Sequence, residues 1–198
     1  CSLPMTHEFT RQKLFQIAFF FILSARNSVL LTRGVALQPN SRRLEKSFRL
    51  QNADLLTEYN LIEAGLARPT VKEADFHGKS AYVAQRELAS QPAYLCTLTM
   101  TDNQDKVGVE RYPVGICPVV DPDSGEVLVD ALGRRSYTTS IAFGPSVGKN
   151  IALAYLPKEY AEEGRELLLE YFDEPFPVKV EAVGCKGLYD PENLLPRQ

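Results

Sequence analysis

The stretch AYLCTLTMT, residues 93–101, decides the fold class of this chain. Its large apolar side chains alternate with a second set of positions that holds Leu95 and three threonines. The alternating apolar positions are Tyr94, Cys96, Leu98 and Met100. A period of two places successive side chains on opposite faces, which is typical of a β-strand. We expect the strand to begin after Gln91 and Pro92, where the pattern changes.

Six further runs with strand character follow, each bounded by glycine, proline or acidic residues. They are VGICPVV (114–120), EVLVDA (126–131), SYTTSIAF (136–143), NIALAYL (150–156), RELLLEYF (165–172) and FPVKVEAV (176–183). The segment DPDSG, residues 121–125, separates the first two runs and predicts a hairpin, because proline and glycine suit a tight turn. About seven strands in roughly 90 residues predict a small antiparallel sandwich or barrel, since an open sheet would expose its edges.

The residues before position 92 have a helical character instead. Apolar and polar side chains at helical spacing predict a helix from Gly78 to Leu88, with Asp75 as a candidate cap. A short helix is predicted earlier, capped by Asn40 or Ser41, with Glu45 placed to reach the free amides near its start. The predicted fold class is therefore α+β, in which the end of an α/β domain precedes a predominantly antiparallel β-barrel.

An apolar stretch near the amino terminus, LFQIAFFFILSA at residues 14–25, differs from both patterns. It is too short to cross a bilayer, because a membrane span needs about 20 residues. Arg11 and Lys13 precede it, as in a signal peptide, yet the chain lacks the ordered cysteine framework of many secreted proteins. We favour a buried core segment over an export signal, and a sequence artefact is the third interpretation.

The composition is that of an ordinary globular protein, with 44% hydrophobic and 24% charged residues. A net charge of −3 argues against nucleic acid as a partner, because nonspecific phosphate binding requires a basic surface. The four cysteines are scattered, without a CxxC pair: Cys1, Cys96, Cys117 and Cys185. We interpret them as reduced, buried thiols and expect no metal site, since zinc sites need close ligand spacing.

The familiar motifs of self-contained chemistry are absent from the sequence, including a nucleophile elbow, a P-loop, a Rossmann fingerprint and a zinc motif. The glycine-rich GPSVG, residues 144–148, lies between two predicted strands and favours a turn over a phosphate cradle. His77 has a side chain that can carry protons near neutral pH, but we favour a surface or cap residue. Asp121, Asp123 and Glu126 favour a solvated turn over a cation site.

One charged cluster suggests ligand chemistry, and its members are Arg42, Arg43, Glu45, Lys46 and Arg49. A carboxylate can accept two parallel hydrogen bonds from a flat amidine-like edge, such as that of a pterin ring. Neighbouring arginines could bind the acidic tail of a folate. The alternative is a solvated helix face with weak surface ion pairs, and from these residues alone we favour that alternative.

Five segments resemble, in the same order, the end of the folate-binding domain and the following β-barrel of the glycine-cleavage T-protein (aminomethyltransferase) family. They are SRRLEKSFRL (41–50), DLLTEY (54–59), IEAGL (62–66), ADFHGKSA (74–81) and GPSVGKNIALAYLP (144–157). The closing LYDPENLLPR, residues 188–197, resembles the tail of the members that are fused to FAD-dependent dimethylglycine and sarcosine dehydrogenases. The resemblance extends from about Asn40 to Asp190.

The resemblance implies a tetrahydrofolate site. Glu45 aligns with the glutamate that binds the pterin in this family, and Arg68 lies near a second folate-contacting basic residue. Ser47 replaces a usual glycine and His77 a usual isoleucine. The catalytic aspartate of the family lies in an amino-terminal half that this chain does not contain, so no catalytic residue is assigned, and we expect little or no turnover by the isolated chain.

The implied domains are an apolar segment of uncertain role at 1–38, the end of the folate-binding domain at 39–91 and the barrel domain at 92–198. The implied function is the C-terminal part of an enzyme that passes a one-carbon unit from a methylated amine to tetrahydrofolate, with FAD bound upstream. Alternatives are a noncatalytic folate-binding or assembly module and a folate-dependent demethylase of another methylated compound. The resemblance implies a cytoplasmic or mitochondrial-matrix location and no membrane partner.

Overall fold

The computed structural model describes residues 39–184 and 186–192. The chain divides into two units between Pro39 and Asn40, and the unit that begins at Asn40 contains all the strands described below. The apolar stretch at 14–25 lies outside the described residues. Among the residues that are described, no helix is long and apolar enough to cross a membrane.

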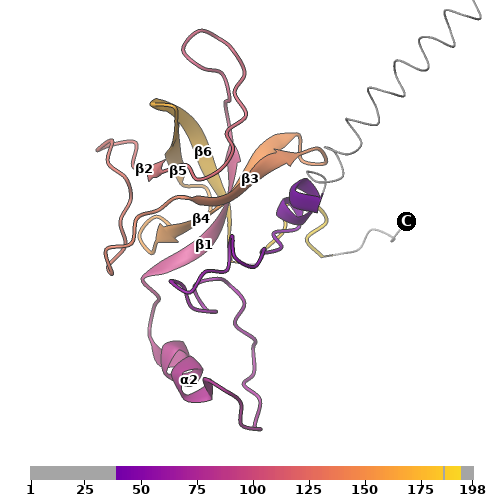
Figure 1. Ribbon diagram of the computed structural model, residues 1–198, viewed down its shortest axis with the longest axis vertical. Coiled ribbons are helices and arrows are strands. Elements are labelled where there is room, and N and C mark those ends of the chain that lie inside the picture. The colour runs from indigo at the N-terminus through magenta and orange to yellow at the C-terminus, as the bar shows by residue number, and fades with distance from the viewer. Residues whose placement is uncertain (1–38, 185, 193–198) are drawn as a thin grey trace, which may run out of the picture. The chain divides into compact units, whose positions relative to one another are not determined.

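Six antiparallel strands form one sheet in the order β2-β5-β6-β1-β4-β3 (Figure 1). The strands are β1 (Ala93–Met100), β2 (Val119–Val120), β3 (Thr138–Gly144), β4 (Lys149–Pro157), β5 (Glu166–Tyr171) and β6 (Glu174–Val183). The stretch that predicted the first strand lies at the centre, where β1 pairs with both β4 and β6. The predicted antiparallel β domain is thereby confirmed.

Hydrogen bonds also connect the two edges of this sheet. Thr138 N–H donates to the carbonyl of Cys117 at 2.8 Å, and Val119 N–H donates to the carbonyl of Ser136 at 3.0 Å. These bonds join the segment that contains β2 to the segment that leads into β3. The sheet therefore curls into a barrel-like form, which leaves less of either edge open to another chain.

The predicted hairpin at 121–125 is present, because Asp121 N–H donates to the carbonyl of Glu126 at 3.0 Å and Gly125 N–H to that of Asp121 at 2.9 Å. The prediction that EVLVDA forms a seventh strand is wrong. Its residues make only isolated bridges. The cause lies in Asp130, whose Oδ1 accepts hydrogen bonds from the backbone N–H groups of Leu132 and Arg134, both at 2.9 Å, and so turns the chain.

The neighbouring strands β1 and β4 are buried on both faces. Their inner face contributes Cys96, Leu98, Met100, Ala152, Ala154 and Leu156 to the main core. Their outer face contributes Leu95, Ile151, Leu153 and Tyr155 to a second cluster, which also contains Leu44 and Ala64. Strands that are covered on both sides have near-continuous apolar sequences, which explains why NIALAYL is so apolar.

Residues 40–66 cover that outer face. The carbonyl of Glu63 accepts a hydrogen bond from Leu95 N–H, and the carbonyl of Asp54 accepts one from the Tyr155 hydroxyl, both at 2.8 Å. Residues 39–45 are helical, so the prediction of Asn40 or Ser41 as the preceding cap is wrong. The Asn40 side chain donates to the carbonyl of Ile141 instead, at 3.3 Å.

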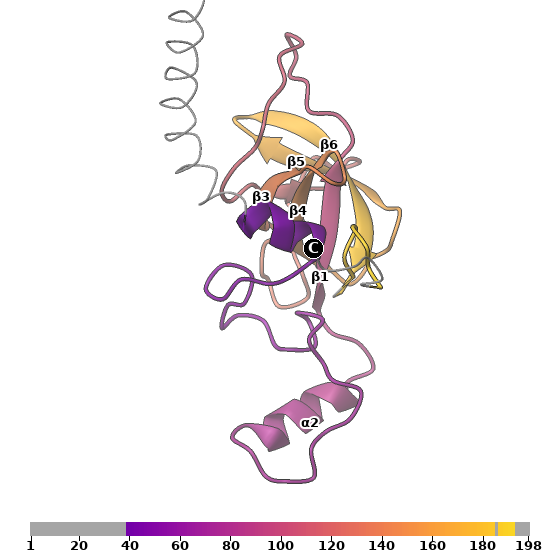
Figure 2. The same ribbon diagram turned by 90° about the vertical axis from the view of Figure 1, so that its right-hand side faces the viewer.

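The predicted helix between Gly78 and Leu88 is confirmed as α2 (Lys79–Glu87). The prediction of Asp75 as its cap is wrong, because Gly78 occupies the cap position in a left-handed conformation with φ of 82° that glycine adopts without steric cost. No residue of α2 is buried, and Figures 1 and 2 show the helix set apart from the sheet. Its apolar stripe therefore does not pack into a core.

Cys96 and Cys117 are free and buried, as interpreted from the sequence, whereas Cys1 and Cys185 lie outside the described residues. Burial raises the pKa of the Cys96 thiol to about 12 and also raises the pKa of Cys117. The thiolate is the reactive form, so we expect both residues to resist iodoacetamide at pH 8 in the folded protein and to react in denaturant. Peptide mass spectrometry measures both, and fast alkylation of native Cys96 would contradict its buried position.

Candidate functional site

Glu45 is nearly enclosed, with 4% of its surface exposed. Its Oε1 accepts a hydrogen bond from the backbone N–H of Ser146 at 2.5 Å. Its backbone carbonyl accepts two more, from the N–H groups of Leu188 at 2.8 Å and Tyr189 at 3.0 Å. The sequence predicted that the Glu45 side chain would reach free amides near Asn40 or Ser41. Its carboxylate binds Ser146 instead, and Glu45 is the last residue of the helical stretch 39–45. Segments about 100 and 140 residues further along the chain hold it instead.

Ser146 lies in the turn that the sequence predicted at GPSVG, and this turn is confirmed by the hydrogen bond from Gly148 N–H to the carbonyl of Gly144 at 2.8 Å. The approach of Glu45 to the turn requires glycine at position 144. A Cβ atom there would lie 3.1 Å from Glu45 Cγ and 2.5 Å from Ile151 Cδ1. The buried carboxylate and the turn are thus packed in direct contact.

The cations around Glu45 are mostly engaged with protein partners. Arg43 pairs with Asp54 at 2.6 Å and also donates to the Ser140 hydroxyl at 2.6 Å. Lys46 pairs with the Asp190 carboxylate at 3.0 Å. Arg49 donates to the carbonyls of Ala64 and Ser47, which belong to the segment 40–66 that covers the sheet (the covering segment). Arg42 is exposed. The favoured interpretation of a solvated helix face is therefore wrong for Arg43, whose side chain is only 14% exposed.

Arg68 lies in a different place, at a cleft of about 970 Å³. Its side chain is exposed, while its carbonyl accepts a hydrogen bond from Arg86. One face of α2 lines this cleft through Ala81, Tyr82 and Gln85, together with Leu88 directly after the helix. Glu45 is not among the lining residues. The two residues that the resemblance implies as folate contacts are therefore not brought into one cavity by the described part of the chain.

A charged network forms one wall of this cleft. Arg134 pairs with Glu63 at 2.5 Å and with Asp130 at 2.6 Å, and its guanidinium lies 4.2 Å from the centre of the Tyr59 ring. Tyr59 in turn stacks on Tyr155 with ring centres 3.6 Å apart. Burial opposes the charge on Arg134, yet hydrogen bonds with the two carboxylates raise its pKa above the usual value.

This network is not predicted by any pattern in the sequence. Glu63 stood in the quoted IEAGL segment, but only as part of the resemblance. Its partner Arg134 lies 71 residues away, and no local pattern connects the two. Burial raises the pKa of Tyr59 to about 12, so its hydroxyl stays protonated at neutral pH and presents a neutral polar group to the cleft.

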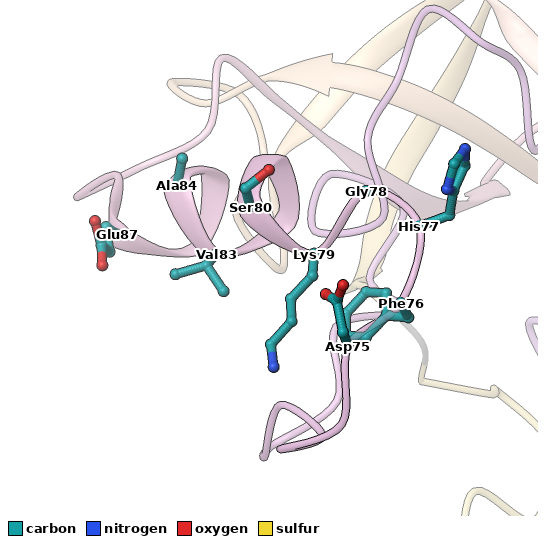
Figure 3. Close-up of a pocket in the computed structure, with 9 residues that line it drawn as sticks. All are labelled: Asp75, Phe76, His77, Gly78, Lys79, Ser80, Val83, Ala84 and Glu87. Atoms are coloured by element: carbon teal, nitrogen blue, oxygen red, sulfur yellow. The ribbon is translucent and has the colours of Figure 1, made fainter.

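A second hollow lies at the start of α2 (Figure 3). Its Lys79 ammonium donates to the backbone carbonyls of Glu73 at 2.6 Å and Ala74 at 3.3 Å, so this cation is already used by the protein. His77 is exposed and its ring points away from Lys79. In residues 39–184 and 186–192, no group of three or more His, Cys, Asp or Glu side chains could hold a metal ion.

Comparison with known proteins places the barrel in a family. Residues 95–184 match the model of the glycine cleavage T-protein C-terminal barrel domain. The chain therefore carries a domain of this class, and the resemblance read from the sequence motifs is confirmed. A crystal structure of glycine cleavage system aminomethyltransferase T from Bartonella henselae shares the fold, with a TM-score of 0.53 and 24% identity over 72% of this chain and 36% of that protein.

Similar proteins include both forms of the family. The mitochondrial dimethylglycine dehydrogenase of Rattus norvegicus is 29% identical over 143 residues, which cover 71% of this chain and 15% of that enzyme. The aminomethyltransferase of Staphylococcus haemolyticus is 33% identical over 135 residues, which cover 65% of this chain and 31% of that enzyme. The chain thus spans less than a third of the length of either relative.

Proposed function

We propose that this chain is the C-terminal part of a tetrahydrofolate-dependent aminomethyltransferase-like module in an enzyme of the dimethylglycine or sarcosine dehydrogenase type. Such an enzyme passes a one-carbon unit from a methylated amine to tetrahydrofolate. The main support is the similarity to dimethylglycine dehydrogenase, which covers 143 residues and is therefore longer than the match of residues 95–184 to the barrel domain. FAD and the amine would bind outside this chain, in a protein of the mitochondrial matrix or the cytoplasm.

Within this function, Glu45 is the residue proposed to bind the pterin. Its carboxylate is nearly enclosed and hydrogen-bonded, so its position is well defined before any ligand arrives. An ionised carboxylate offers about four acceptor positions, and the bond from Ser146 uses one of them. The remaining positions suit two parallel donors on a flat ring edge, which is how a carboxylate gives both affinity and orientation.

Arg68 is proposed as a second contact, to the acidic tail of the folate. Its side chain is exposed at the rim of the cleft, and the described residues offer it no hydrogen-bonded or ionic partner. A guanidinium binds a carboxylate through two parallel hydrogen bonds. Because Glu45 lies outside this cleft, the assignment requires that the remainder of the enzyme complete one site from both residues.

The test is tetrahydrofolate binding by the full-length enzyme. We expect Glu45→Ala and Glu45→Gln to weaken tetrahydrofolate about 10- to 100-fold, because each removes a charge-assisted pair of hydrogen bonds. Glu159→Ala is the control, since it deletes an exposed carboxylate on the loop after β4 and should leave the affinity unchanged. Isothermal titration gives the dissociation constants. Equal affinity of Glu45→Gln and the native enzyme would remove Glu45 from the site.

A further inference from the structure

The turn that contacts Glu45 has no residue assigned to ligand binding, yet it makes a direct bond to the proposed ligand carboxylate. Residues 144–148 join β3 to β4, and the backbone N–H of Ser146 donates to Glu45 Oε1 at 2.5 Å. The Ser146 side chain is exposed and forms no hydrogen bond among the described residues, so the contact belongs to the backbone. A bond from a backbone N–H to a carboxylate is charge-assisted and is roughly twice as strong as a neutral one.

We infer that this turn is the positioning element of the ligand carboxylate, with the backbone N–H of Ser146 as the group that sets its orientation. The inference rests on the proposed function of Glu45. A glutamate side chain rotates about three bonds, and a ligand that binds a freely rotating carboxylate must also order it. Because Ser146 fixes one oxygen in advance, the ligand meets an acceptor edge of defined direction.

Two other contacts support a positioning role. Gly144 lacks a Cβ that would lie 3.1 Å from Glu45 Cγ, so the turn approaches the stem of the side chain as well as its end. The main chain of Glu45 is fixed separately, because its carbonyl accepts hydrogen bonds from Leu188 and Tyr189. The turn 144–148 therefore contacts both the stem and the carboxylate, whereas a different segment holds the backbone. Among the described residues, the bond from Ser146 is the one that acts on the carboxylate itself.

The most direct test removes only the backbone N–H at position 146. In the full-length enzyme, Ser146→Ala keeps the N–H, and L-lactate incorporated at the same position replaces that N–H with an ester oxygen. We expect Ser146→Ala to bind tetrahydrofolate within about twofold of the native enzyme, because the exposed hydroxyl forms no bond. The lactate form should bind about tenfold more weakly than Ser146→Ala, since it lacks one charge-assisted hydrogen bond.

The same exchange in a Glu45→Gln background distinguishes positioning of the carboxylate from a general structural effect of the ester. In a Glu45→Gln background, the lactate exchange should change affinity by less than twofold, because the charged acceptor is already gone. Equal effects in both backgrounds, or equal affinity of the ester and amide forms, would overturn the positioning role and leave the proposed function intact. If Glu45→Gln instead binds tetrahydrofolate as tightly as the native enzyme, the proposed function of Glu45 is wrong.

A second pair of variants covers the case in which the ester protein does not fold. Ile151→Val removes the Cδ1 atom that a Cβ at position 144 would strike at 2.5 Å. The double variant Gly144→Ala/Ile151→Val then adds a methyl group that would lie 3.1 Å from Glu45 Cγ and 3.2 Å from the Cγ1 position of residue 151, and so presses on the Glu45 stem. We expect about fivefold weaker tetrahydrofolate binding than Ile151→Val alone, with a similar melting temperature. Equal affinity of the two would overturn the role of the turn.

Discussion

Replacement of Asp54 with alanine should lower the free energy of unfolding by about 3–5 kcal/mol. The Asp54 side chain is fully buried and joins residues 40–66 to the outer face of the barrel. Its carboxylate accepts hydrogen bonds from Arg43 at 2.6 Å, from Leu50 N–H at 2.8 Å and from the Thr139 hydroxyl at 2.5 Å. The substitution removes an acceptor from three donors, among them a guanidinium that is largely withdrawn from water and loses its ionic partner.

Chemical denaturation of the chain measures this loss. The control is Asp123→Ala, which removes an exposed carboxylate from the hairpin turn and should change stability by less than about 0.5 kcal/mol. Arg43→Met/Asp54→Ala should recover part of the loss, because no buried charge then lacks its partner. A loss below about 1 kcal/mol for Asp54→Ala would show that the covering segment is not held through this carboxylate.

The strands could be predicted because the sequence features that specify them lie at neighbouring positions. Alternation in AYLCTLTMT and the turn residues around it are properties of neighbouring positions, and β1 begins at Ala93 and ends at Met100 as that pattern indicates. The cap of α2 is also local, yet the sequence pattern favours Asp75, whereas Gly78 stands directly before the helix. A capping side chain was expected where a left-handed glycine begins the helix without a side-chain hydrogen bond.

The covering segment and the surroundings of Glu45 depend on contacts that sequence patterns do not contain. Asp54 and Thr139 are 85 residues apart, and Glu45 and Ser146 are 101 residues apart. Propensity and periodicity describe one element at a time, so neither could pair these residues. The resemblance to the T-protein family did identify Glu45 as a residue of interest, but it did not indicate the turn that holds it.

The stability of the cleft wall is expected to depend on Arg134. Its substitution with methionine should lower the free energy of unfolding by about 3–5 kcal/mol. Glu63 and Asp130 would then be left as neighbouring buried carboxylates, with side chains only 3% and 2% exposed. The aromatic face of Tyr59 would also lose its cationic neighbour, although methionine retains a long apolar stem over the ring.

Arg135→Met is the matched control, because Arg135 is the next residue, is exposed and should tolerate the change within about 0.5 kcal/mol. Arg134→Lys separates charge from geometry. Lysine keeps the charge but cannot form the two-sided fork that binds Glu63 through Nη2 and Asp130 through Nε, so we expect it to recover less than half of the loss. Full recovery by lysine in urea denaturation would mean that charge alone, and not the planar guanidinium, stabilises this wall.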